Sequence, residues 1–266
     1  MNTLKKMFYS KIHRMPHLIP KPLSSTHTIN HFIEAMRRHD PRLIEHGERT
    51  AIYTLLLGRI LNVPDVDLLG FCHAALLHDL GKLTLPNEVI HANGISIIGE
   101  YLMTECTPAA GAEILRAWPD LQEISKLIAL HHEHWDGSGN PFGMRGTFIP
   151  LGARILSLAD TVDQLLSQKD DRIPTQISAL NRVLRALAAT RLDPNLVEIF
   201  IREVSPRLRI FFLSLPSPLL CQTQRKLQTF RERGSTNRLN IDPLLKRILD
   251  LTNPVSIEST VKTLVR

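Results

Sequence analysis

The sequence is poor in cysteine and aromatic residues, and it has no long apolar run. Its three cysteines, Cys72, Cys106 and Cys221, are too few and too widely spaced for a disulfide framework. We therefore expect a reducing, cytoplasmic compartment. No stretch approaches the roughly 20 apolar residues of a transmembrane segment, and the basic N-terminus lacks the apolar centre of a secretory signal. The sequence thus predicts neither a disulfide-stabilised secreted domain nor a helical membrane protein.

The composition is that of a globular protein with a helical core. Of 266 residues, 43% are hydrophobic and 22% are charged, whereas only 5% are aromatic, so aliphatic residues and alanine must supply most of the core. The formal net charge of +6 favours anionic partners in a general way but does not identify one.

The chain divides into three predicted parts. Residues 1–27 are basic and proline-rich, which predicts a mobile leader, and residues 28–204 carry the regular apolar patterning of one domain. Residues 205–266 are predicted to form a basic, helical C-terminal extension. A nucleic-acid or membrane-surface role for this extension is an alternative, but a charge run is more often a solvated helical face. We therefore do not expect nucleic acid as a partner.

Apolar residues at helical spacing indicate an all-α fold, because no alternation typical of a strand persists for more than a few residues. The predicted helices cover 29–39, 43–61, 65–81, 108–117, 124–132, 150–167, 177–187 and 194–204. His39-Asp40-Pro41 predicts the end of the first helix, because the residue before a proline avoids the helical region. Asp193-Pro194 predicts a helix start, with the aspartate as cap and the proline at the first helical position.

His78 and Asp79 stand side by side within an apolar run that is predicted to be helical. Burying an imidazole and a carboxylate together is costly unless something compensates them, and a divalent metal takes both as ligands. The alternative is a capping aspartate beside a hydrogen-bonded core histidine. Lys82 follows one turn later, where an ammonium could contact a phosphate.

Further candidate ligands lie on other predicted helices whose apolar faces should converge: His46, His131, His132 and Asp160. Nitrogen and oxygen donors without thiolate favour iron, manganese or zinc over a structural zinc site. An aspartate that bridges two ions about 4 Å apart is typical of two-metal centres that hydrolyse phosphate esters.

The order of these residues resembles the HD phosphohydrolase superfamily. His46 precedes His78-Asp79 and Gly81-Lys82, as in that superfamily, and the stretch 131–141 (HHEHWDGSGNP) resembles the signature of the HD-GYP family of bacterial cyclic di-GMP phosphodiesterases. Ala159-Asp160 and Leu192-Asp193-Pro194 resemble the helices that follow in the family. The similarity covers residues 28–204.

The resemblance implies an all-α HD-domain helical bundle with two metal positions. By this resemblance the first ion is held by His46, His78, Asp79 and Asp160, and the second by Asp79, His131 and His132. Lys82 would contact the scissile phosphate and act in catalysis with Asp79. Lys169 and Arg172 occupy the positions of two further phosphate-binding residues, with the order of Arg and Lys exchanged.

Three positions depart from the family pattern. Thr107 stands where the family has a histidine ligand, so the second metal loses a strong donor unless Glu105, Cys106 or water replaces it. Asn140 replaces the tyrosine of the Gly-Tyr-Pro motif, which is not a ligand. Arg42 occupies the place where some members carry a carboxylate for a third metal, so we expect two divalent ions at most, with Fe or Mn favoured and Zn an alternative.

These features leave three hypotheses. The first is a metal-dependent phosphodiesterase acting on cyclic di-GMP or a related cyclic dinucleotide in bacterial signalling. The second is a catalytically degenerate member that binds a dinucleotide or a signalling protein, through the 139–141 loop or through residues 205–266, and is motivated by Thr107. The third, a hydrolase of another phosphomonoester, is disfavoured by the 131–141 loop.

Overall fold

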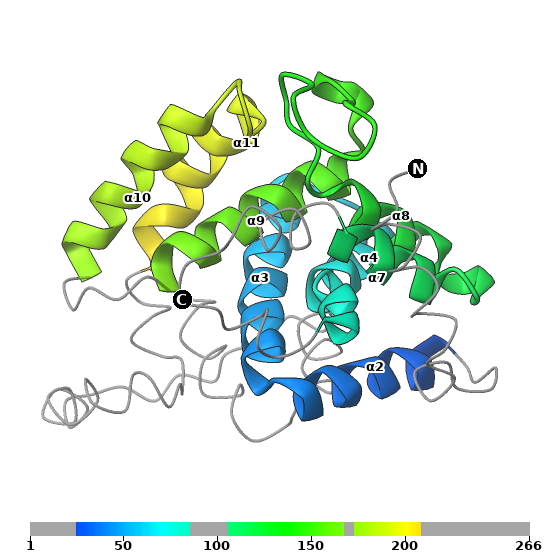
Figure 1. The fold of residues 1–266 in the computed structure, drawn as a ribbon. Coiled ribbons are helices and arrows are strands. Elements are labelled where there is room, and N and C mark those ends of the chain that lie inside the picture. Colours follow the sequence, from blue (N-terminus) through cyan, green and yellow to red (C-terminus); the bar gives the residue numbers. More distant parts are fainter. Residues whose placement is uncertain (1–24, 86–105, 168–172, 209–266) are drawn as a thin grey trace, which may run out of the picture.

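A computed structural model describes residues 25–85, 106–167 and 173–208, and within these ranges it confirms the all-α prediction, since they contain helices and no strand. The predicted leader before Ser25 and the predicted extension after Leu208 lie outside the described residues. Figure 1 shows the arrangement of the helices. They are α2 (Ser25–His39), α3 (Pro41–Ile60), α4 (Asp65–Leu77), η2 (Leu80–Thr84), α7 (Thr107–Leu115), η4 (Pro119–Leu121), α8 (Gln122–Leu130), η5 (Gly146–Phe148), α9 (Leu151–Ser167), α10 (Ile173–Leu187), α11 (Pro194–Ile199), η6 (Phe200–Val204) and η7 (Ser205–Arg207).

The junction between α2 and α3 follows directly from the local sequence. Asp40 has an extended backbone, and its side chain accepts a hydrogen bond from the backbone N–H of Arg42 at 3.0 Å. Pro41 occupies the first turn of α3, where its missing N–H costs nothing. The helix therefore begins two residues earlier than the predicted Leu43, and His46 lies in its second turn.

Helix α3 is the centre of the bundle and packs against both α4 and α9 (Figure 1). Its two sides belong to two apolar clusters. The first cluster joins α2, α3, α4, α7 and α8 around fully buried residues such as Phe32 and Leu76. The second joins α3, α9, α10, α11 and η6 around Tyr53 and Phe200, whose rings lie edge to face with centroids 6.5 Å apart. The parts of α3, α4, α8 and α9 that carry or adjoin the candidate ligands are thus held by packing.

The α10–α11 turn is anchored by Asp193, as the Asp193-Pro194 pair predicted. The carboxylate of Asp193 accepts hydrogen bonds from the N–H groups of Asn195 at 2.9 Å and Leu196 at 3.4 Å. It also pairs with Arg154 of α9 at 2.5 Å. This buried pair ties the start of α11 to α9.

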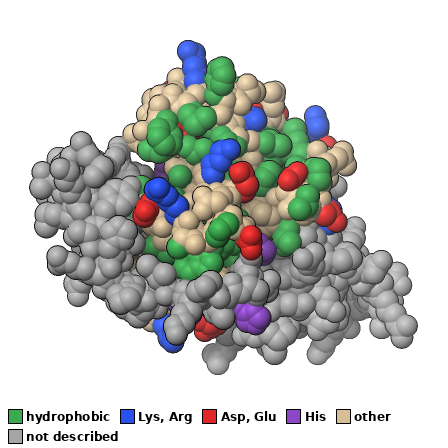
Figure 2. Space-filling model, turned by 90° about the vertical axis from the view of Figure 1, so that its right-hand side faces the viewer, with side chains coloured by type: hydrophobic (Ala, Val, Ile, Leu, Met, Phe, Trp, Pro, Cys, Tyr) green, Lys and Arg blue, Asp and Glu red, His purple; other side chains and the backbone are tan. Residues whose placement is uncertain are grey.

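In the described part of the chain, no helix combines the length and apolar character that crossing a membrane requires. Figure 2 shows one face of the molecule, on which acidic, basic and apolar side chains of the described residues are interspersed.

Candidate metal centre

Four of the candidate ligands lie where helices end, whereas His46 lies in the second turn of α3 and Asp160 lies within α9. Helix α4 ends at Leu77, and His78 is its C-cap, while Asp79 (φ −89°, ψ 7°) leads into η2. The prediction of a continuous helix through His78 and Asp79 was therefore wrong. The chain turns here because η2 packs directly on α7, with Gly81 against the carbonyl of Thr107. His131 is likewise the C-cap of α8, and His132 follows in the turn.

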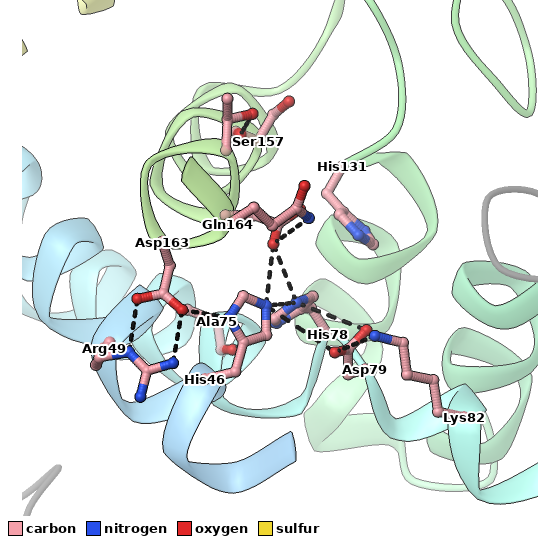
Figure 3. A network of polar contacts seen from close by, with 12 residues as sticks. His46, Arg49, Ala75, His78, Asp79, Lys82, His131, Ser157, Asp163 and Gln164 are labelled. Atoms are coloured by element: carbon pink, nitrogen blue, oxygen red, sulfur yellow. Dashed lines mark hydrogen bonds and ion pairs between the residues drawn. The ribbon is translucent and has the colours of Figure 1, made fainter. Parts of the chain in front are cut away.

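Four of the predicted ligands converge on one point (Figure 3). One donor atom each from His46, His78 and Asp79 lies within 4.8 Å of the other two. Asp160 on α9 joins them, because its Oδ1 lies 3.0 Å from His46 Nε2 and 3.7 Å from His78 Nε2. Residues 114 positions apart in the sequence thus share one buried polar site.

The imidazoles are oriented by hydrogen bonds on their outer nitrogens. His78 Nδ1 donates to the carbonyl of Ala75 at 2.8 Å, and His131 Nδ1 donates to the carbonyl of Ile128 at 2.7 Å. A carbonyl only accepts, so in the neutral ring the proton is on Nδ1 and Nε2 presents its lone pair to the site. This is the form in which histidine binds a metal.

His131 and His132 extend the site from α8. The ring centroid of His131 lies 5.4 Å from that of His78 and 4.1 Å from that of His132. Burial lowers the pKa of His131 well below its ordinary value, with His132 and His78 acting in the same direction. Burial lowers the pKa of His132 to about 4, against the opposing charges of Asp160 and Asp79. Both rings are therefore neutral at physiological pH.

The two carboxylates are kept ionised despite their burial. Burial alone would raise the pKa of Asp79, but Lys82, whose Nζ lies 2.6 Å from Oδ2, and the nearby His78 and His46 hold it well below its usual value. Burial likewise opposes ionisation of Asp160, and the hydrogen bond with His46 lowers its pKa. The site therefore carries a concentration of negative charge.

The pKa of His46 also indicates that the site favours positive charge. Burial would lower its pKa, but hydrogen bonds to Asp160 and Asp163 and the charge of Asp79 raise it to about 10. A buried set of imidazole nitrogens and carboxylate oxygens that attracts a cation fits a divalent metal ion.

Sequence reasoning did not assign a role to the residues that support these ligands. Asp163, 1% exposed, has Oδ2 2.6 Å from His46 Nδ1, and Arg49 binds both of its oxygens at 2.7 and 2.9 Å. Gln164 Nε2 donates to both oxygens of Asp160 at 2.9 and 2.8 Å. The available signal was spacing, since Arg49 follows His46 by three residues and Asp163 follows Asp160 by three.

Of the remaining predicted site positions, Lys82 and Thr107 lie within the described residues. Lys82 lies in η2 beside Asp79. Thr107 is buried at the start of α7, next to the buried Cys106. Lys169, Arg172 and Glu105 lie outside the described residues.

The loop after His132 is fixed from two sides. The buried carboxylate of Glu133 accepts the N–H groups of Phe142 at 2.6 Å and Met144 at 2.8 Å. On the other side, the N–H of Trp135 donates to the carbonyl of Arg191 at 3.1 Å and that of Asp136 to Thr190 at 2.9 Å. The loop that carries Asn140 is therefore part of the packed domain.

Comparison with protein families matches residues 30–196 to the HD domain. The chain is similar to 3'3'-cGAMP-specific phosphodiesterase 3 of Vibrio cholerae, with 32% identity over 154 residues, which are 58% of this chain and 34% of that protein. It is 28% identical to a cyclic di-GMP phosphodiesterase of Thermotoga maritima over 59% of this chain and 43% of that protein. It is 31% identical to the cyclic di-GMP phosphodiesterase response regulator RpfG of Xanthomonas campestris over 66% of this chain and 47% of that protein. The chain thus spans less than half the length of each of these relatives.

Solved structures share the fold. The crystal structure of the cyclic GMP-AMP phosphodiesterase V-cGAP3 of V. cholerae has a TM-score of 0.51 and 20% identity, covering 85% of this chain and 59% of that one. The HD domain of the Listeria monocytogenes phosphodiesterase PgpH, in complex with cyclic-di-AMP, has a TM-score of 0.50 and 13% identity, covering 71% of this chain and 99% of that one. At these identities the similarity concerns the fold alone.

Proposed function

This chain belongs to the HD domain family, and we propose that it is a metal-dependent phosphodiesterase that hydrolyses cyclic di-GMP or a related cyclic dinucleotide in bacterial signalling. The observation that carries the proposal is the convergence of His46, His78, Asp79 and Asp160, with the ammonium of Lys82 beside Asp79. Imidazoles that present Nε2 and ionised carboxylates form a centre suited to phosphate-ester chemistry.

We propose that two divalent ions at most bind here, with Fe or Mn favoured over Zn. His46, His78, Asp79 and Asp160 would hold one ion, and Asp79, His131 and His132 would hold the other. Such ions supply Lewis acidity that stabilises the charge developing on a phosphodiester.

The chain's own residues would bind and orient the substrate. Lys82 Nζ is partly exposed and 2.6 Å from Asp79, so a phosphate at this site would meet a positive charge fixed in direction by the aspartate. Lys169 and Arg172 remain proposed contacts for the substrate's other phosphate. The buried surroundings of Asp79 and Asp160 exclude bulk water and strengthen each of these electrostatic interactions.

The names of the relatives support a cyclic dinucleotide as the proposed substrate class. The matched proteins are named as phosphodiesterases of 3'3'-cGAMP and of cyclic di-GMP. A cyclic dinucleotide carries two phosphodiesters, which fits a centre with more than one source of positive charge. We propose the cytoplasm as its compartment, where such dinucleotides would be encountered.

The test combines metal analysis of the purified protein with hydrolysis assays on cyclic di-GMP, 3'3'-cGAMP and cyclic-di-AMP. We expect metal to copurify and at least one dinucleotide to be linearised, and we expect Asp79→Ala to abolish both. Asp67→Ala, at an exposed position in the first turn of α4, is the matched control and should retain both properties. Metal-loaded protein that leaves all three dinucleotides intact would contradict the proposal.

Thr107 favours a second candidate, a dinucleotide- or protein-binding module without turnover. The threonine is only 3% exposed at the start of α7, at the position where the resemblance to the HD-GYP family predicts a histidine ligand. Thr107→His should increase metal content and hydrolysis if the second ion is limiting. Tight dinucleotide binding without hydrolysis in both proteins would favour the second candidate.

A signalling protein is a proposed partner of the loop that carries Asn140. Two large apolar side chains that follow Asn140 in the chain are exposed, with Phe142 75% and Phe148 80% accessible. The proposed contact through residues 205–266 concerns a segment outside the described residues.

A further inference from the structure

We propose that Asp163, held in place by Arg49, is a positioning residue that sets the metal affinity of the centre by orienting His46. The inference rests on the proposed metal centre but not on the proposed substrate. Asp163 does not face the converging donors, since it lies behind His46, on the side of Nδ1 (Figure 3).

The geometry around Asp163 fixes one imidazole at both edges. His46 Nδ1 lies 2.6 Å from Asp163 Oδ2, while His46 Nε2 lies 3.0 Å from Asp160 Oδ1 and 3.1 Å from His78 Nε2. A carboxylate at Nδ1 keeps a proton there, so once Nε2 has lost its own proton, the lone pair of the neutral ring is directed at the centre. Asp163 therefore selects both the tautomer and the direction of this ligand.

His46 differs from the other oriented histidines in the charge of its partner. His78 and His131 donate to neutral backbone carbonyls, whereas His46 donates to a carboxylate. An anionic acceptor increases the electron density of the ring and makes Nε2 a stronger donor to a cation. His46 is also the ligand that approaches from α3, so its orientation decides whether α3 contributes to the centre.

Arg49 completes the arrangement. Its Nε donates to Asp163 Oδ1 at 2.7 Å and its Nη2 to Oδ2 at 2.9 Å, so three N–H groups converge on the two oxygens of a side chain that is 1% exposed. The guanidinium neutralises the charge of Asp163, which would otherwise be a second uncompensated carboxylate buried on the same helix as Asp160. Arg49 and His46 lie one turn apart on α3, so a single helix supplies both partners of Asp163.

Asp163→Asn tests the arrangement, because it keeps the shape and replaces one acceptor oxygen by a donor. In either orientation the new NH₂ group faces an N–H of Arg49 or of His46. We expect the affinity for Mn²⁺, measured from the electron paramagnetic resonance signal of the free ion, to fall about 10- to 100-fold. Arg49→Lys keeps the charge with a single point donor, so its loss should be smaller.

Asp193→Asn is the matched control, since Asp193 is also a buried aspartate paired with an arginine, Arg154, but it has no contact with the centre. It should lower the thermal midpoint of the metal-free protein and leave the Mn²⁺ affinity unchanged. Unchanged affinity in Asp163→Asn, or an equal loss in Asp193→Asn, would overturn the inference. A wild-type protein that binds Mn²⁺ without hydrolysing dinucleotides would remove the proposed activity and leave this inference standing.

Discussion

Gly81 lies against Thr107 so closely that a β-carbon on the glycine would be 1.9 Å from the threonine carbonyl oxygen. It would also be 2.8 Å from the backbone nitrogen of Gly111. This contact packs η2 tightly against α7. It thereby fixes the positions of Asp79, just before η2, and of Lys82, next to Gly81.

Gly81→Ala should therefore destabilise the fold, because the added methyl group meets backbone atoms that cannot move independently of α7. We expect a loss of about 3 kcal/mol in the free energy of unfolding, measured by urea denaturation. Gly70→Ala is the control, since a β-carbon there meets nothing within 4 Å and Gly70 lies inside α4. It should stabilise the protein by about 0.5–1 kcal/mol. Equal effects of the two substitutions would show that the contact is not tight.

Lys82→Met should lower hydrolysis of the dinucleotide substrate without loss of metal. Removing one positive charge from a phosphate site costs about 100-fold in kcat. The metal content should stay the same or rise, because the ammonium 2.6 Å from Asp79 competes with a cation for that carboxylate. Steady-state assays with parallel metal analysis measure both quantities. Lys126→Met, on an exposed residue 3.9 Å from Glu123, should change neither, and a matching loss of activity there would contradict the assignment.

Glu133→Gln should loosen the loop that follows His132. The carboxylate accepts two backbone N–H groups, of Phe142 and Met144, and an amide can accept only one of them through oxygen. A buried donor left without an acceptor costs about 1–3 kcal/mol. Hydrogen exchange at the amides of Phe142 and Met144 should accelerate, whereas the surface substitution Glu113→Gln should leave it unaltered. Undiminished protection in Glu133→Gln would argue against the carboxylate as the support of the loop.

The metal-free protein should lose stability as the pH falls from about 6.5 to about 4. The fold lowers the pKa of His132 from 6.5 to about 4, so the unfolded chain takes up this proton first and is favoured by acid. His131 acts in the same direction. His46 acts in a different pH range, because its raised pKa gives a stabilisation that is complete below pH 6.5 and is lost as the pH rises from 6.5 to about 10.

Urea midpoints measured in the presence of a chelator test this dependence. His132→Gln should flatten the decline between pH 6.5 and 4, and His27→Gln, on an exposed position of α2, should keep it. An identical slope in wild type and His132→Gln would mean that the ring of His132 is not held neutral by the fold.

The features predicted from the sequence are those encoded by local signals. Asp193-Pro194 predicted the start of α11, because a carboxylate caps free N–H groups and proline lacks one, and Asp40-Pro41 predicted the end of α2. The candidate ligands were identifiable because a buried histidine or aspartate on an apolar helix needs a partner. The comparison with HD proteins then agreed with the family that these residues resemble.

The features that the sequence could not reveal depend on contacts between distant segments. Helix α4 ends at Leu77 although Leu80 and Leu83 continue the apolar spacing, because α7 requires η2 to turn. The Arg49–Asp163 pair joins residues 114 positions apart, and no local pattern shows which buried charges will meet. Propensity and periodicity describe single helices, whereas the support of the ligands is a property of their packing.

All candidate ligands precede Ser167, yet the domain cannot be trimmed to the helices that carry them. The carbonyl groups of Thr190 and Arg191 receive the N–H groups of Asp136 and Trp135, a few residues after His132. Deleting α10 and α11 would strip these acceptors and uncover Tyr53, which is buried on the back of α3. The smallest part of the chain that can fold on its own therefore extends beyond the last candidate ligand, Asp160, to include α10 and α11.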